Sequence, residues 1–264
     1  MIGKIYLNFD LEEFDIPCEY GHYLKEKEQI QVSNEGAETL LELLQKKGLK
    51  VTFFTTASFA LKKTELIKTI LAFGHEIASH GLSHNPIGKD EELHLSKKIL
   101  EDICSVQILG YRSPRFRAVN YQSLICSGYK YNSSINPTWL PGRYNYLSFP
   151  RKIFCEQGLV QIPISTTPLF RIPLCWLSFK NIPLSLFKTF SLWTLQEKGY
   201  LNIFFHPWEF ANIQQYPIPR IAKAIDGLVL LQRLEAYISW LQSLEVKFCT
   251  LNDVLQKERP VEQL

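Results

Sequence analysis

The feature that most constrains the fold is the alternation of short apolar runs with longer helical patterns. Ile5–Phe9 alternates with period two, which is typical of a strand, and Val51–Phe54 is rich in β-branched and aromatic residues. Further strands are expected at His75–Ala78, Ile108–Tyr111, Tyr129–Tyr131, Leu159–Ile164, Tyr200–Phe205 and Val246–Thr250. Because helical patterns separate most of these segments, we expect an α/β fold with parallel pairing through right-handed crossovers.

The helices between these strands carry recognisable start and stop signals. Asn34 is placed to cap the first long helix, which is expected to end at Gly48. Thr64 is placed to cap the next helix, with Gly74 at its end. Later helices are expected around Leu95–Ile103, around Leu124, at Leu186–Lys198 and at Val229–Leu244.

Residues 135–183 interrupt this rhythm. They hold seven of the 14 prolines, which exclude long helices, together with many aromatic residues. We interpret the segment as an ordered insertion in a single domain that spans residues 1–264, because its aromatic density is too high for a disordered linker. The aromatic side chains are expected mainly to pack the insertion onto the rest of the fold, with the lining of a substrate cleft as the alternative.

Composition excludes several classes of protein. Hydrophobic residues make up 46% and charged residues 21% of the 264 residues, as in a globular protein. The net charge of +3 gives no reason to expect a nucleic-acid partner. No apolar run is long enough for a transmembrane helix, and acidic residues from Asp10 onward exclude a signal peptide, so we expect a cytoplasmic protein.

The six cysteines are widely spaced and form no CxxC pair. A zinc knuckle or a redox motif is therefore not expected. We expect buried, reduced thiols that behave as small hydrophobic side chains.

Carboxylates follow the first predicted strand. If the extended backbone continues past Asp10, the side chains of Asp10 and Glu12 point to the same side. Neighbouring carboxylates repel each other unless a cation lies between them or one holds a proton. Acidic residues after a strand are more often solvated, so this segment alone does not establish a site.

A histidine pair follows the strand at His75–Ala78. His80 and His84 are spaced i, i+4, so they would meet on one face of a helical turn and could chelate one metal ion. Neutral imidazole suits zinc, cobalt, nickel and iron. The spacing also occurs often by chance.

Two more strands end in chemically useful residues. Arg112 could pair with a carboxylate and hold it ionised, although a basic surface loop is the simpler interpretation. His206 emerges from an apolar strand just before Pro207 and is a candidate general acid, although a lone histidine is more often a hydrogen-bonded core residue. Taken together, the four strand ends supply the groups that metal-assisted hydrolysis needs.

The order of these motifs resembles the polysaccharide deacetylases of NodB homology, and most of all the branch associated with exopolysaccharide biosynthesis. The resemblance rests on Phe9-Asp10-Leu11-Glu12, Gly74-His75-Glu76-Ile77 with His80 and His84, Gly110-Tyr111-Arg112-Ser113-Pro114, Gly128-Tyr129-Lys130-Tyr131-Asn132-Ser133-Ser134 and His206-Pro207-Trp208-Glu209. It implies a distorted (β/α)7-type barrel and a metal-dependent hydrolase that removes N-acetyl groups from an amino-sugar glycan or its lipid-linked precursor.

The resemblance also implies roles for single residues. Asp10 would be the general base, Arg112 would hold it, and His206 would protonate the leaving amine. The ligands of a divalent metal, first of all zinc with cobalt, nickel or manganese as alternatives, would be His80, His84 and a carboxylate close after the base. Substrate contacts are expected from Tyr111, whose neighbouring backbone N–H would stabilise the oxyanion, and from Pro114, Trp208 and Glu209.

Two positions depart from the family pattern. Leu11 stands where the family most often has a second aspartate, which moves the expected ligand to Glu12 and leaves Glu13 and Asp15 as further candidates. Asn132 stands where related sequences usually have Asp. Two other functions are therefore weighed: hydrolysis of a small non-sugar amide on the same fold, and an inactive barrel that binds a glycan or a partner.

Overall fold

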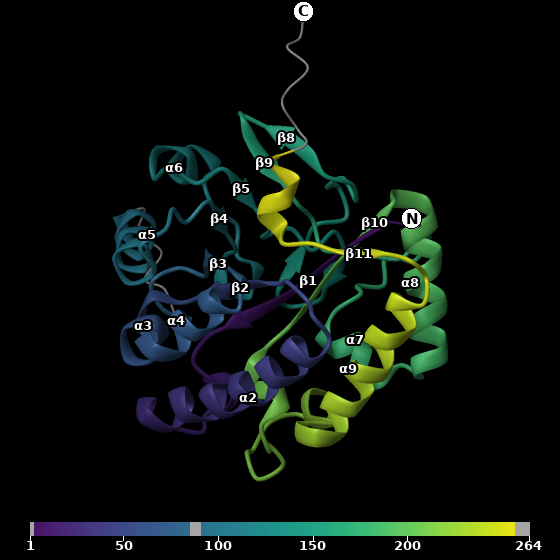
Figure 1. Cartoon of the computed structure of the whole chain (residues 1–264), viewed down its shortest axis with the longest axis horizontal. Coiled ribbons are helices and arrows are strands. Elements are labelled where there is room, and N and C mark those ends of the chain that lie inside the picture. Colours follow the sequence, from purple (N-terminus) through teal and green to yellow (C-terminus); the bar gives the residue numbers. More distant parts are fainter. Residues whose placement is uncertain (1–2, 85–90, 257–264) are drawn as a thin grey trace, which may run out of the picture.

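The computed structural model describes residues 3–84 and 91–256, and within them a curled sheet forms the centre of the molecule (Figure 1). Seven of its strands run parallel in the order β10-β1-β2-β3-β4-β5-β9. Their bounds are Tyr200–Phe205 (β10), Lys4–Leu11 (β1), Thr52–Thr55 (β2), Glu76–Ser79 (β3), Gly110–Tyr111 (β4), Tyr131–Asn132 (β5) and Leu159–Gln161 (β9). This confirms the predicted α/β fold of the distorted (β/α)7-barrel type.

Short additional strands extend the parallel set. β8 (Phe154–Glu156) pairs antiparallel with β9, and β11 (Lys247–Phe248) pairs with the start of β1. Past the end of β9, the backbone N–H of Ser165 donates to the carbonyl oxygen of Asn202 in β10 at 2.9 Å. The chain after β9 thus reaches back to the other end of the strand order and helps to curl the sheet toward closure.

β1 separates two environments by its period of two. Ile5, Leu7, Phe9 and Leu11 belong to the apolar layer beneath the helices. The intervening Asn8 and Asp10 are also buried, and they point to the opposite, interior side of the curled sheet. Because this interior is polar near the carboxyl end of β1, it can hold charged side chains that pair with one another.

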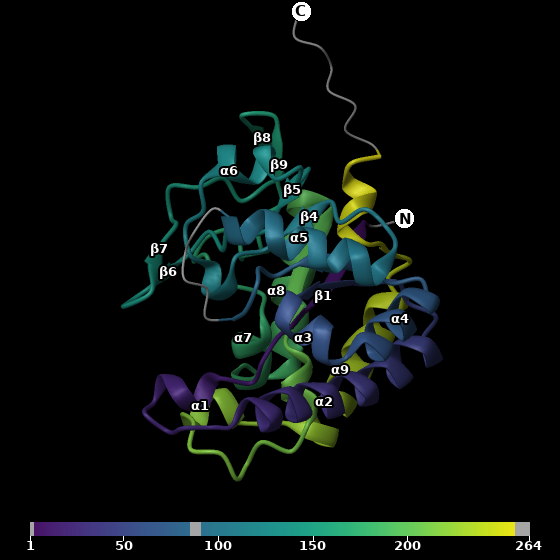
Figure 2. The same cartoon turned by 90° about the vertical axis from the view of Figure 1, so that its left-hand side faces the viewer.

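Helices pack around the sheet (Figures 1 and 2). Their bounds are Glu26–Lys46 (α2), Ala57–Lys62 (α3), Thr64–Ala72 (α4), Glu91–Cys104 (α5), Tyr121–Cys126 (α6), Leu184–Lys198 (α8) and Gly227–Gln242 (α9). The shorter helices α1 (Ile16–Glu19) and α7 (Trp176–Asn181) lie beside the pocket described below.

Two predicted helix caps are wrong. α2 begins at Glu26, with Glu26 and Glu28 favourably placed at its positive end, so Asn34 lies inside the helix and donates to Glu38 instead. Thr64 is the first residue of α4, and its hydroxyl donates to the carbonyl oxygen of Ala60. The threonine that does cap a helix is Thr56, at the start of the unpredicted α3.

The insertion is ordered, and its aromatic residues divide into three groups. It contains the β6–β7 hairpin, formed by Trp139–Leu140 and Tyr144–Asn145, as well as β8, β9 and α7. Tyr146 packs within the fold, whereas Tyr144 and Trp176 line the pocket, and Trp139 and Phe170 are 60% and 76% exposed. The prediction that the aromatic residues pack the insertion onto the fold therefore holds for some of them, whereas the alternative of a cleft lining holds for Tyr144 and Trp176.

Among the residues that the structure describes, no helix is long and apolar enough to cross a membrane. The cytoplasmic location stays a prediction.

All six cysteines lie in the described ranges and are free thiols, as predicted. Burial was predicted for all of them, but Cys18, Cys126 and Cys155 are exposed. Their wide spacing in sequence carries no information about which side of an element they occupy.

Candidate functional site

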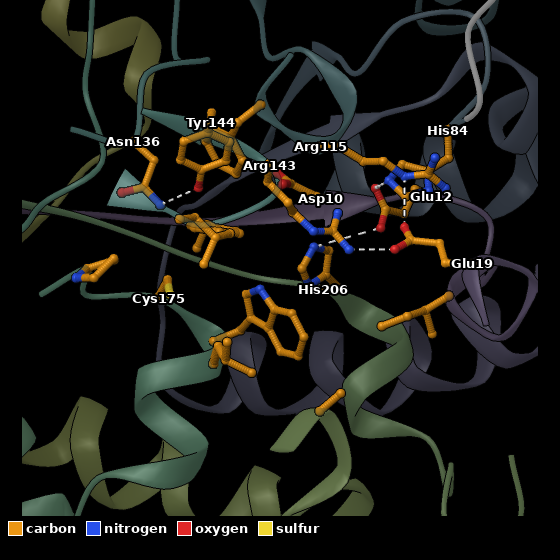
Figure 3. Close-up of a pocket in the computed structure, with 18 of the residues that line it drawn as sticks. Asp10, Glu12, Glu19, His84, Arg115, Asn136, Arg143, Tyr144, Cys175 and His206 are labelled. Carbon is orange, nitrogen blue, oxygen red and sulfur yellow. Dashed lines mark hydrogen bonds and ion pairs between the residues drawn. The ribbon is translucent and has the colours of Figure 1, made fainter. Parts of the chain in front are cut away.

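The carboxyl ends of β1, β3, β4 and β10 meet around one pocket, as expected for parallel strands. Its volume is about 310 Å³, and Asp10, Glu12, His80, His84 and His206 are among its lining residues. Figure 3 shows Asp10 and His206 near the middle of this pocket, with Glu12 and His84 toward one end. Side chains that are far apart in sequence are therefore neighbours here.

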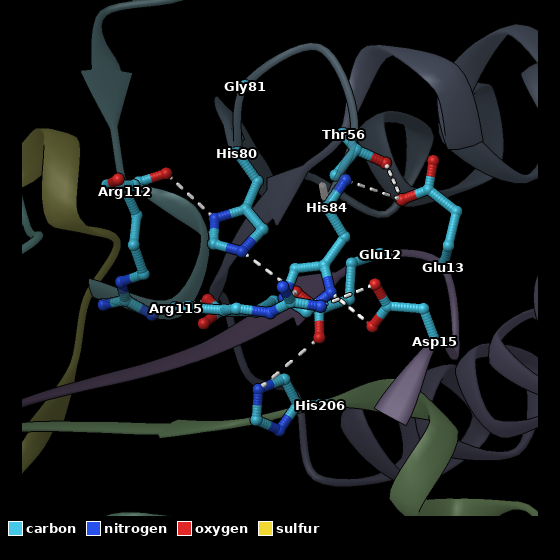
Figure 4. A network of polar contacts seen from close by, with 12 residues as sticks. Glu12, Glu13, Asp15, Thr56, His80, Gly81, His84, Arg112, Arg115 and His206 are labelled. Atoms are coloured by element: carbon cyan, nitrogen blue, oxygen red, sulfur yellow. Dashed lines mark hydrogen bonds and ion pairs between the residues drawn. The ribbon is translucent and has the colours of Figure 1, made fainter. Parts of the chain in front are cut away.

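Glu12, His80 and His84 form the group, among the described residues, that could hold a metal ion. One ligand atom from each lies within 4.8 Å of the others. Glu12 Oε2 lies 3.0 Å from His80 Nε2 and 3.1 Å from His84 Nε2 (Figure 4). Two imidazoles and one carboxylate are a donor set that divalent zinc and its neighbours favour.

The outer nitrogens of both histidines are already engaged. His80 Nδ1 lies 2.9 Å from the carbonyl oxygen of Arg112, and His84 Nδ1 lies 2.6 Å from Asp15 Oδ1. Each Nδ1 is thus positioned to donate a proton to its acceptor, so the Nε2 atom of each ring is the one available to a metal ion beside the Glu12 carboxylate. The two Nε2 atoms and the Glu12 carboxylate lie close together, so this donor set fits a metal ion.

The titration of these groups reflects the same charge pattern. Burial alone would raise the pKa of Glu12, but the imidazoles of His84, His206 and His80 lower it to about 2. Burial opposes protonation of His84, but Glu12 and Asp15 raise its pKa to about 9. The cluster therefore favours an ionised Glu12 with positive charge beside it.

The structure distinguishes the three carboxylates that the sequence left open. Glu13 turns away, accepting hydrogen bonds from the Thr56 hydroxyl and the His84 backbone N–H. Asp15 contacts the outer nitrogen of His84 and not the inner one. Of the three, Glu12 is the one whose carboxylate reaches both inner nitrogens.

The predicted helical turn for His80 and His84 is wrong. The segment is an irregular bend, in which Gly81 has a φ of +80°. Its carbonyl oxygens accept hydrogen bonds from the N–H groups of Ala57 and Ser58 at the start of α3. The bend still brings the imidazole rings together, with ring centroids 6.0 Å apart.

Arg112 holds Asp10 in a buried ion pair. Arg112 Nη1 donates to Asp10 Oδ1 at 2.6 Å, and both side chains are almost fully buried. Arg112 also donates from Nε and Nη2 to the carbonyl and hydroxyl oxygens of Ser133, and its guanidinium lies 4.0 Å from the centroid of the Phe54 ring. The orientation of the Asp10 carboxylate is thus fixed from behind.

Asn132 acts within this support. Its Oδ1 accepts hydrogen bonds from the backbone N–H and the hydroxyl of Ser134, and its Nδ2 donates to Gln161. The Ser134 hydroxyl in turn accepts from the backbone N–H of Ser113, next to Arg112. Asn132 therefore shapes the segment that holds Arg112, a role that needs no negative charge.

His206 lies on another side of the cluster and is held by a buried pair of charges. Its Nδ1 is 3.0 Å from Glu209 Oε1, and its Nε2 is 3.7 Å from Glu12 Oε1. Glu209 Oε2 is 2.9 Å from Lys180 Nζ, and the Glu209 and Lys180 side chains are completely buried. Burial lowers the pKa of His206, but Glu12 and Glu209 outweigh it and raise that pKa.

The four predicted substrate contacts lie in different places. Trp208 lines the pocket, and its Nε1 donates to Glu12 Oε1 at 3.3 Å. Tyr111, Pro114 and Glu209 are buried and do not line it. Glu209 instead positions His206, because its carboxylate accepts from the backbone and the ring of that residue.

Sequence reasoning missed a chain of ion pairs across the pocket. Arg115 contacts Asp15 at 2.8 Å and Glu19 at 2.9 Å, and Glu19 also contacts Arg143 of the β6–β7 hairpin at 2.5 Å. These pairs join α1 to the insertion. The positions of these charged residues and of Lys180 follow no strand or helix period. No sequence pattern could therefore have predicted their contacts.

Part of the sequence matches known proteins. Residues 4–122 match the family model described as polysaccharide deacetylase. A peptidoglycan deacetylase of Helicobacter pylori is 33% identical over 108 residues, which are 38% of this chain and 37% of that protein. The chain thus matches little more than a third of that relative's length.

Solved structures resemble the whole described fold. A putative polysaccharide deacetylase from Mycobacterium smegmatis superimposes with a TM-score of 0.67 at 17% identity, over 97% of this chain and 90% of that chain. Puue allantoinase superimposes with a TM-score of 0.66 at 16% identity, over 96% of this chain and 89% of that chain. At such identities these structures show the shared fold alone. The match of residues 4–122, which covers less than half of the chain, shows that this part of the sequence is similar to the polysaccharide deacetylases.

Proposed function

We propose that the protein is a divalent-metal-dependent hydrolase that removes N-acetyl groups from an amino-sugar polysaccharide or its lipid-linked precursor. The observation that carries this proposal is the convergence of Glu12, His80 and His84 beside the paired Asp10 and the glutamate-held His206. The match of residues 4–122 to the polysaccharide deacetylase family model and the similarity to the H. pylori peptidoglycan deacetylase support the substrate class. Placement in the exopolysaccharide-associated branch remains a prediction.

Glu12, His80 and His84 would hold the cation, with zinc as the first expectation. A bound divalent cation supplies Lewis acidity, which polarises the scissile carbonyl and acidifies water. The Glu12 carboxylate would balance part of the cation's charge. Asp15 and the Arg112 carbonyl fix the rings of His84 and His80, so the two Nε2 donors need no rearrangement on binding.

Asp10 and His206 would move the protons. Asp10 accepts a proton from the attacking water, while Arg112 keeps its carboxylate oriented. His206 donates a proton to the nitrogen of the leaving amine, which departs poorly as an anion. Glu209 holds the ring through Nδ1, so Nε2 is the nitrogen that faces the pocket. The backbone near Tyr111 is proposed to stabilise the oxyanion.

The lining of the pocket favours a sugar over a small anion. Phe116, Tyr144, Trp176 and Phe204 supply aromatic walls, against which the C–H faces of a pyranose ring can pack. The lining arginines, Arg115 and Arg143, are both paired with carboxylates. A small anionic amide would have to break those pairs before it gained a cationic partner.

Zinc titration by calorimetry and acetate release from tetra-N-acetylchitotetraose test the proposal. The wild-type protein is expected to bind one Zn²⁺ and to release acetate, and His80→Gln and His84→Gln are expected to lose both properties. His94→Gln, an exposed histidine of α5, is the matched control and should retain them.

Zinc binding that survives both His80→Gln and His84→Gln would contradict the metal site. Zinc binding without hydrolysis of any acetylated glycan would favour the inactive binding barrel. Hydrolysis of small linear amides alone would favour the non-sugar alternative.

A further inference from the structure

The opening of the pocket is marked by lining residues that remain exposed to solvent. They include Tyr20 after α1, Leu140 of the β6–β7 hairpin and Ile221 of η3 (Arg220–Lys223). Tyr23 and Trp139, close to them in sequence, are 86% and 60% exposed. Figure 2 shows α1 and the β6–β7 hairpin on the same side of the molecule. Three separate segments therefore present apolar and aromatic side chains around one opening.

The charges in these three segments are all positive. Residues 20–25, 137–149 and 212–225 contain no Asp or Glu. Their cationic side chains are Lys25, Arg143, Arg220 and Lys223. A surface that meets the opening of the pocket therefore meets an excess of positive charge.

Neighbouring carboxylates do not cancel this charge. Glu19 lines the pocket and is exposed, but it is already paired with Arg115 and Arg143. Lys25 and Arg220 are exposed, and neither forms an ion pair with any residue that the structure describes. Their charges are thus available to an external anionic surface.

We infer that the rim of the pocket docks on a lipid bilayer that carries anionic headgroups. The rim comprises Tyr20, Tyr23, Trp139, Leu140 and Ile221 together with the four cations of the same segments. Tryptophan and tyrosine settle at the membrane–water interface, where the ring meets the apolar region and the polar group stays hydrated. Each lysine or arginine held near an anionic surface strengthens the binding further.

A bilayer fits the rim better than a protein partner does, because the rim surrounds the opening of the pocket. A protein seated on all three segments would close the site to its substrate. A bilayer can itself carry the substrate, since a lipid-linked glycan emerges from the headgroup region where the pocket opens. This step rests on the proposed function, and it favours the lipid-linked precursor over a free polysaccharide.

Co-sedimentation with vesicles measures the docking directly and needs neither metal nor substrate. We expect the protein to bind vesicles that contain phosphatidylglycerol, and to bind vesicles of phosphatidylcholine alone about tenfold more weakly. Added salt should weaken the binding to the anionic vesicles, because exposed charges are screened.

Single substitutions in the rim test its two components. Trp139→Ser and Ile221→Ser remove apolar surface, whereas Lys25→Gln and Arg220→Gln each remove one positive charge. Each variant is expected to raise the Kd for vesicles that contain phosphatidylglycerol about fivefold.

Matched controls lie at the opposite end of the parallel strands. Val106 is exposed in the turn that leads into β4, and Lys247 is exposed in β11, beside the start of β1. Val106→Ser and Lys247→Gln should bind these vesicles like the wild-type protein.

Tryptophan fluorescence reports which side of the protein meets the lipid. Brominated phospholipids in the anionic vesicles should quench the wild-type fluorescence, and Trp139→Phe should lose most of that quenching. Trp193→Phe, which changes a tryptophan of α8 outside the pocket lining, should keep it.

A wild-type protein that does not bind the anionic vesicles would overturn the inference, as would equal binding to both kinds of vesicle. Equal effects of the rim and control variants would also overturn it. If vesicle binding fails while acetate is still released from tetra-N-acetylchitotetraose, the inference is wrong and the proposed hydrolase stands. Rim-dependent vesicle binding without release of acetate from any acetylated glycan would support the docking surface and contradict the hydrolase.

Discussion

Replacing the Asp10 carboxylate by an amide should strongly reduce catalysis without affecting metal binding. Asn at this position can still accept the hydrogen bond from Arg112, but it cannot take up a proton at neutral pH. We expect Asp10→Asn to bind zinc like the wild-type protein and to lose about 10²–10⁴-fold in kcat.

Acetate release and zinc calorimetry on the same preparation check this prediction. Asp102→Asn, on the exposed surface of α5, controls for the substitution itself. Undiminished turnover of Asp10→Asn would mean that another group is the base.

Arg112 combines an orienting role with a structural one. Its guanidinium makes three hydrogen bonds, to Asp10 and to two oxygen atoms of Ser133, inside a fully buried site. Lysine keeps the charge but cannot reproduce this fork. We expect Arg112→Lys to lower the free energy of unfolding by about 2–3 kcal/mol, since buried acceptors lose their donors, and to lower kcat.

Urea denaturation measures the change in stability caused by Arg112→Lys. Arg117→Lys is the matched control, because this neighbouring arginine is exposed. Equal stability of the two variants would show that the fork contributes little to folding.

At the scale of single residues, much of the site was predictable from sequence. Asp10 lies at the end of β1, and His80, Arg112 and His206 directly follow β3, β4 and β10. Parallel strands bring their carboxyl ends together. Lys180 and Arg143 could not be predicted, because they lie in the insertion, where no period places one residue relative to another. Their contacts are decided by tertiary packing.

At the scale of elements, the period of apolar residues predicted the strands better than capping residues predicted the starts of helices. The strand at Tyr200–Phe205 has the bounds that its apolar run predicts. The caps at Asn34 and Thr64 were wrong because a capping residue is also tolerated inside a helix, where its side chain bonds to the preceding or following turn. The hairpin in the insertion was missed because its strands are only two residues long.

His75, the residue just before β3, should make the free energy of unfolding depend on pH in the acid range. Burial, with a smaller effect of Lys50, lowers the pKa of His75 to about 4, and its Nε2 has no hydrogen-bond partner in the described structure. The unfolded chain has the ordinary pKa of about 6.5, so it binds a proton before the folded protein does. The contribution of His75 to stability is therefore complete above pH 6.5 and is lost as the pH falls toward 4.

His75→Gln removes this titration, and glutamine can still accept the hydrogen bond from the Val51 N–H. Between pH 7 and pH 4, the wild-type protein should lose about 2 kcal/mol more of its unfolding free energy than the variant does. Urea denaturation at a series of pH values measures both curves. Parallel curves would show that His75 does not titrate in this range.

At the scale of the whole molecule, metal binding should stabilise the fold globally. The expected ligands lie directly after β1 and in the bend after β3, so the cation would cross-link distant parts of the chain. Zinc at 100 times its Kd contributes about 2.7 kcal/mol, which corresponds to a rise in Tm of roughly 5–10 °C for a domain of this size.

Calorimetric melting with and without a chelator tests this, and His84→Gln should abolish the difference. One cooperative transition is expected, because a single domain was predicted for residues 1–264. Two separate transitions would contradict that prediction, and an unchanged Tm in the wild-type protein would contradict the metal site.

Side chains along β1 alternate between its two faces, so the proposed base and the proposed ligand both depend on the same register of this strand. Asp10 faces the pocket and Leu11 packs in the apolar layer beneath the helices. One extra residue inserted just before Asp10 would turn both carboxylates toward that layer and bring Leu11 into the pocket. Among related sequences, an odd-length insertion or deletion in this strand therefore marks the loss of both functions at once, whereas substitutions can remove them one at a time.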